Sequence, residues 1–116
     1  MDDDRTDALF AALANRDRRR MLDLLVQAPG MTVSALASHF TMSRIAVTKH
    51  LKALEAAGLV QSEKHGRTRH LFLDPSPIQS AYDRWTTELS AFWAARMADI
   101  KARAELRAAS RETRRA

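Results

Sequence analysis

The spacing of the apolar residues changes character at Gly58. Before it, Val47, Leu51 and Leu54 recur at the i, i+4, i+7 spacing of a helix with one buried face. A glycine suits the left-handed residue that ends such a helix. After it, residues 59–73 form two extended segments around a glycine-containing turn. The pattern predicts a helix followed directly by a β-hairpin.

Shorter helices are expected before this point. Residues 6–14 and 18–28 have helical apolar spacing, and a third helix of about two turns follows Thr32, a suitable cap. The interruption at residues 41–43 ends in Ser43, which can cap the next helix. Two short helices joined by a three-residue interruption and followed by a basic hairpin are typical of a winged helix-turn-helix.

A long helix is expected after the hairpin. The prolines of residues 74–77 end the strand, and the helix could run to about Leu106, a length of about 45 Å at 1.5 Å per residue. On so small a domain it would expose a large aromatic patch, which monomers rarely tolerate. Core or a ligand pocket is the other interpretation of these side chains. The predicted dimer interface on this helix comprises Tyr82, Trp85, Leu89, Phe92 and Trp93.

The expected fold is mainly α with a small β-hairpin, with about five helices plus the wing, and it is dimeric. Four segments are predicted: an acidic N-terminal tail (1–6), a winged helix-turn-helix domain (7–74), a dimerisation helix (75–107) and a basic tail (108–116).

The charge pattern favours a polyanionic partner. The formal net charge is +5, and residues 43–70 carry six basic side chains against two acidic ones. A helix that enters the major groove needs N-terminal residues that are free of core contacts, and the residues after Ser43 meet this condition. We therefore expect double-stranded DNA as the partner.

The predicted DNA contacts divide into two sets. The residues predicted to read bases are Ser43, Arg44, Ile45 and Thr48. Arg44 can bond a guanine with its fork of donors, and Thr48 can contact an amide-bearing base or a thymine methyl. The residues predicted to contact the DNA backbone, from the helix and the wing, are Lys49, His50, Lys52, Lys64, His65, Arg67 and Arg69. For His50, packing against the hairpin with a backbone hydrogen bond is an equally open interpretation.

Several function classes find no support in the sequence. The chain has no cysteine, which excludes disulfides, thiolate catalysis and thiolate metal sites. It shows no Ser-His-Asp grouping, no phosphate-cradling glycine loop and no paired carboxylates, so we do not expect an enzyme. It shows neither a secretion signal nor the ~20-residue apolar run of a membrane helix, so we expect a cytoplasmic protein without membrane contact. The alternative function is a winged helix that binds another protein.

Two segments resemble the ArsR/SmtB family of bacterial transcriptional repressors: LANRDRRRMLDLL (13–25) and LASHFTMSRIAVTKHLKALEAAGLV (36–60), together with the wing. The resemblance is most specific from Ser43 to Leu51. It implies a homodimer built by the first and last helices, which adds Leu9 and Phe10 to the interface. It also implies operator binding that is relieved by an inducer. In a dimer, two reading helices about 34 Å apart can engage successive major grooves, so we expect the operator to be pseudo-palindromic.

The chain departs from the family pattern in its metal ligands. Founding members of the family sense metals through cysteines on the first helix of the DNA-reading motif, or through histidine and carboxylate pairs on the last helix. This chain has no cysteine and no histidine after His70. Its resemblance is therefore to the metal-independent branch, with no metal or cofactor expected and the inducer unassigned. His65 and His70 flank the hairpin turn, but two imidazoles alone make a poor metal site.

Overall fold

The computed structural model describes residues 2–87 and 90–115, and the chain divides into two compact units, Met1–Ala81 and Tyr82–Ala116. The first unit contains four helices before the wing: α1 (Asp3–Leu13), α2 (Arg16–Gln27), α3 (Val33–Ala37) and α4 (Arg44–Ala56). None of the described helices is long and apolar enough to cross a membrane.

Each of these four helices begins at a side chain that caps it. The caps are Asp2, Asn15, Thr32 and Ser43, and each accepts a hydrogen bond from the backbone N–H three residues on. Thr32 and Ser43 were predicted as caps from sequence. The helix α1 begins earlier than predicted, because Asp2 caps it and the following acidic residues lie at the positive end of the helix dipole. Most of the expected acidic tail is therefore the first turn of α1.

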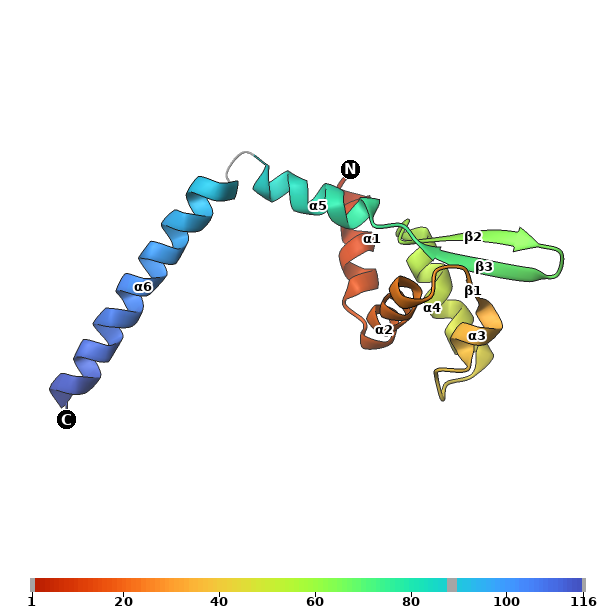
Figure 1. Ribbon diagram of the computed structural model, residues 1–116, viewed down its shortest axis with the longest axis horizontal. Helices are drawn as coiled ribbons and strands as arrows, with labels where there is room; N and C mark the ends of the chain where they lie inside the picture. Colours follow the sequence, from red (N-terminus) through yellow and green to blue (C-terminus); the bar gives the residue numbers. More distant parts are fainter. Residues whose placement is uncertain (1, 88–89, 116) are drawn as a thin grey trace. The chain divides into compact units, whose positions relative to one another are not determined.

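The wing is a hairpin of β2 (Val60–His65) and β3 (Thr68–Leu73), which extends beyond the helices of the first unit (Figure 1). His65 pairs with Thr68, which leaves Gly66 and Arg67 as a two-residue turn, and Gly66 has a φ of 62°. The predicted hairpin is confirmed. A third strand, β1 (Met31–Thr32), was not predicted. It pairs antiparallel with β3, so the sheet order is β1-β3-β2.

The core of the first unit lies between the helices and the inner face of the sheet. Val47, Leu51 and Leu54 of α4 are buried, as their spacing predicted. The other fully buried large side chains are Leu9, Met21, Leu25, Leu36, Leu59, Val60 and Leu71. Leu9 is only 1% exposed and belongs to the core of its own chain, whereas its neighbour Phe10 is 49% exposed. The core thus fixes the buried face of α4 and leaves Arg44 and Ile45 at its start exposed.

The turn after α4 requires glycine at position 58. Gly58 has a φ of 76°, and an added Cβ would lie 3.4 Å from Cγ of Pro77. We expect Gly58→Ala to lower the free energy of unfolding by about 1–2 kcal/mol, because alanine disfavours the left-handed conformation. Urea denaturation measures this change. Gly58→Asn should cost less, since asparagine tolerates that conformation. Equal stability of all three proteins would contradict this account of the turn.

The C-terminal segment contains α5 (Ser76–Thr86) and α6 (Ser90–Arg115) where one helix over 75–107 was expected. The helix α5 ends at Thr86, which is followed by Thr87. Both residues are β-branched and have low helix propensity. Most of the expected basic tail is helical, because α6 continues to Arg115. Leu89, predicted at the dimer interface, lies outside the described residues.

Asp74 prepares the start of α5. Its Oδ1 accepts the backbone N–H of Ser76 at 3.0 Å, and this hydrogen bond lowers the pKa of the Asp74 carboxyl below its ordinary value. The ionised Asp74 carboxylate therefore satisfies a free backbone N–H at the start of α5, which begins at Ser76.

Candidate nucleic-acid interface

The first turn of α4 presents the residues predicted to read bases. Ser43 Oγ accepts the N–H of Ala46 at 3.1 Å, and this bond leaves the serine hydroxyl hydrogen available to another acceptor. Arg44 and Ile45 follow at once and are exposed, with Ile45 76% exposed despite its apolar side chain. Thr48 is half-buried one turn later. Lys49 and Lys52 are exposed farther along α4.

A hollow of about 310 Å³ brings the first turn of α4 together with the start of α3 and the tip of the wing. Arg44 Nη1 donates to Ser34 Oγ at 3.4 Å across this hollow. The lining residues are Thr32, Val33, Ser34, Arg44, Thr48, Arg67, Thr68 and Arg69. Three arginines and several hydroxyl-bearing residues thus line one concave surface. This arrangement of donors suits a polyanion.

The wing residues have different environments. Lys64, His65 and Arg67 are exposed near the hairpin turn. Arg69 Nη2 instead donates to Glu55 Oε1 of α4 at 2.8 Å and to Ser62 Oγ of β2 at 2.9 Å. The Arg69 side chain therefore links the wing to the last turn of α4.

Similar proteins share both this sequence pattern and this architecture. A family model described as a helix-turn-helix domain matches residues 13–63. YuzN, an HTH-type transcriptional regulator of Bacillus subtilis, is 34% identical over 85 residues, covering 68% of this chain and 92% of the relative. An ArsR-like transcriptional regulator from Rhodococcus sp. RHA1 has a TM-score of 0.66 at 35% identity, covering 87% of this chain and 91% of that chain.

The chain belongs to the ArsR family of transcriptional regulators. A homodimeric winged helix-turn-helix DNA-binding domain from Mycobacterium bovis, a possible ArsR-family regulator, has a TM-score of 0.58 at 28% identity. The match covers 69% of this chain and 80% of that one. The family and the winged helix-turn-helix fold expected from the sequence are therefore confirmed.

His50 of this ArsR-family chain has a partner that sequence reasoning missed. Its Nδ1 accepts a hydrogen bond from Nε of Arg18 in α2 at 3.2 Å. The other interpretation of His50 was that it packs against the hairpin with a backbone hydrogen bond. The structure instead shows a side-chain contact with α2. The arginines within residues 16–20 could have indicated this contact. Such a cluster, however, usually forms a solvated helix face.

The histidines of the wing lie close together. The rings of His65 and His70 meet edge to face with centroids 5.1 Å apart, and Glu63 Oε2 lies 3.5 Å from His65 Nε2. His70 Nδ1 lies 2.9 Å from the carbonyl oxygen of Gly30, which ties the ring to the chain before β1. Across the described residues of this ArsR-family chain, no three potential metal ligands gather in one place.

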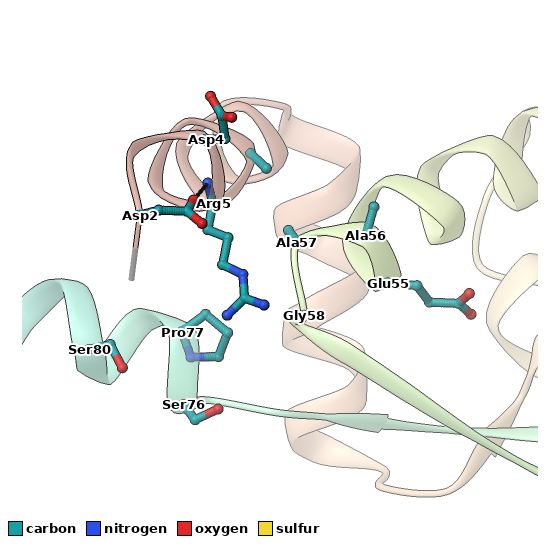
Figure 2. A pocket seen from close by; sticks show the side chains of 11 residues that line it. Asp2, Asp4, Arg5, Glu55, Ala56, Ala57, Gly58, Ser76, Pro77 and Ser80 are labelled. Atoms are coloured by element: carbon teal, nitrogen blue, oxygen red, sulfur yellow. Dashed lines mark hydrogen bonds between the residues drawn. The ribbon is translucent and has the colours of Figure 1, made fainter.

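A second hollow, of about 670 Å³, lies at the opposite end of α4. Figure 2 shows the Arg5 side chain reaching from α1 toward Pro77 and Gly58, while the Glu55 carboxylate points away from them. In this ArsR-family chain, the larger hollow is thus separate from the arginine-lined one at the first turn of α4.

Proposed function

We propose that this ArsR-family chain is a homodimeric repressor that binds a pseudo-palindromic DNA operator through the first turn of α4 and the wing. The single observation that carries the proposal is the hollow shared by Arg44, Thr48 and Arg67. It combines donors for base edges with cations for phosphates on one exposed surface. Repression requires no further contact, since a dimer that covers its operator excludes other proteins from it.

The base-reading roles follow from chemistry and exposure. Arg44 would bond guanine O6 and N7, and Thr48 would contact the next bases along the groove. Ile45, exposed at the start of α4, would contact a thymine methyl. The Ser43 hydroxyl, which already caps α4, would donate its hydrogen to a base or a phosphate. These assignments remain predictions.

The phosphate contacts would come from exposed cations on both elements. Lys49 and Lys52 follow the reading turn, and Lys64, His65 and Arg67 lie near the wing turn. Arg69 would act differently, because Glu55 and Ser62 already hold its guanidinium group. We propose that Arg69 sets the angle of the wing to α4 and that phosphate contact is its lesser role.

The dimer is proposed from the apolar side chains of the C-terminal segment. Trp93, Met97 and Ile100 recur at helical spacing on α6, and all three are at least 40% exposed in the single chain. Tyr82, Trp85 and Phe92 are also exposed, as is Phe10 of α1. A contiguous exposed patch of large apolar side chains is rare on a monomer and indicates an interaction surface. The homodimeric Mycobacterium bovis domain supports a second copy of the chain as that partner.

Selection of bound duplexes from a random DNA pool tests the function. A palindromic consensus with half-sites about 34 Å apart, one helical turn, is expected. We also predict that metal ions do not regulate this DNA binding. Adding metal salts to the complex of the protein with the selected DNA would test this prediction. No enrichment even at low salt would contradict the proposal and favour the protein-binding alternative.

Arg44→Ala tests the base-reading assignment. We expect it to lower affinity for the selected operator by about 1–3 kcal/mol and to relax the preference at one base position. Fluorescence anisotropy on operators that vary one base pair at a time measures both effects. Arg5→Ala, which removes the same charge from α1, is the matched control. Equal losses on every sequence for Arg44→Ala would show that Arg44 contacts only phosphate.

A further inference from the structure

Arg18 connects three elements of the first unit. Its backbone N–H donates to Oδ1 of Asn15, the cap of α2, at 3.1 Å. Its Nη1 donates to the carbonyl oxygen of Ala11 in α1 at 3.3 Å. Its Nε donates to Nδ1 of His50 in α4 at 3.2 Å. The guanidinium group is thus fixed at two points beside the helix that carries the reading residues.

This contact selects one state of the His50 ring. Arginine has five N–H donors and no acceptor, and it stays protonated in proteins. Nδ1 of His50 must therefore be the acceptor and carry no hydrogen. A neutral imidazole then has its one hydrogen on Nε2. Within the described part of the chain, no hydrogen bond to Nε2 of His50 is present, and the ring is half-buried.

The two flanks of α4 have different neighbours. Arg44 and Thr48 line the hollow shared with the wing, whereas His50 contacts α2. A helix in the major groove has a phosphate backbone along each edge. A donor on the α2 flank would therefore serve the backbone that the wing does not reach.

We propose that Arg18 is a positioning residue that holds His50 in the Nε2–H tautomer, so that this N–H donates to a phosphate oxygen on the α2 side of the reading helix. The inference deepens the proposed function and rests on DNA binding by α4. Arg18 itself acts through His50.

The tautomer can be read in the free protein. Nitrogen-15 NMR of the histidine rings in the full chain should show Nε2–H for His50 in the wild type. Arg18→Met, which keeps the apolar stem and removes the donor, should give a mixture of ring states. Arg19→Met is the matched control. Arg19 Nη1 likewise donates to a carbonyl near the end of α1, that of Leu13 at 2.7 Å, and forms no hydrogen bond with α4 in the described residues.

The phosphate contact is tested on a mixed-sequence duplex at low salt, which requires no knowledge of the operator. We expect His50→Phe and Arg18→Met each to weaken DNA binding about threefold to tenfold. The double variant should bind no more weakly than either single variant, because both changes remove the same hydrogen bond from His50 to phosphate. His50→Gln places an amide N–H near the position of Nε2. In that background, Arg18→Met should therefore weaken binding no more than Arg19→Met does.

The outcomes separate the inference from the function on which it rests. A wild type that binds no duplex at low salt contradicts DNA binding itself. An Nδ1–H tautomer in the free wild type contradicts the positioning role, whether or not DNA binds. Binding losses for Arg18→Met and His50→Phe that add in the double variant also overturn it, since the residues would then act independently.

Discussion

Replacing both Trp93 and Met97 with aspartate is expected to give a monomer and to weaken operator binding by about 10²–10⁴-fold. Both side chains lie on one face of α6 and are exposed in the single chain, so each charge would have to be buried when two copies associate. The monomer would engage one half-site and lose the advantage of simultaneous binding. Light scattering gives the oligomeric state, and anisotropy on the selected operator gives the affinity.

The control places the same charges on the opposite face of the same helix. Ala95 and Ala102 lie about half a turn away from the Trp93 and Met97 face, and both are exposed. Ala95→Asp with Ala102→Asp should leave the protein dimeric and its operator affinity within a few-fold of wild type. A dimer that persists with Trp93 and Met97 replaced would place the interface elsewhere, with Phe10 of α1 the next residue to change.

Leu9→Ala is expected to lower the free energy of unfolding by about 2–5 kcal/mol, the usual cost of emptying a leucine site in a packed core. Leu9 is 1% exposed and lies among the buried residues of the first unit. Because the lost contacts lie within one chain, the destabilisation should not depend on protein concentration. Urea denaturation at two protein concentrations checks both points.

Phe10→Ala is the comparison for Leu9→Ala. It removes a larger apolar side chain at the next position of α1, but one that is 49% exposed. If Phe10 lies at the dimer interface, its loss should weaken association and make the unfolding midpoint more dependent on concentration. If Leu9→Ala left stability unchanged and weakened dimerisation, Leu9 would belong to the dimer interface and not to the core.

Leu9 and Phe10 also show why part of the site could not be predicted from the sequence. Both residues are apolar neighbours in a short helix, and helical periodicity does not say which of the two faces the core. In α4 the pattern was sufficient, because three apolar residues at i, i+4 and i+7 define a single buried face. The Ser43 cap and the exposure of Arg44 followed from the same local pattern.

Contacts between distant parts of the chain were not predictable. The Arg18–His50 hydrogen bond joins residues 32 positions apart, and β1 is only two residues long, too short for any alternation. The end of α5 was missed for a different reason. The apolar spacing continues across Thr86 and Thr87, while their β-branched side chains disfavour the helix. The prediction followed the apolar spacing, whereas α5 ends at Thr86.

The short strand β1 has a consequence for the kind of DNA that the domain would accept. Thr32 pairs with His70 of β3 and also caps α3, so the wing and the helix-turn-helix are joined at one residue. The Arg69–Glu55 ion pair joins them again at the far end of α4. These two attachments should limit how far the wing can move relative to α4. We expect a duplex that contacts both elements to adjust its groove width, so that its stiffness would contribute to selectivity at base pairs that no side chain touches.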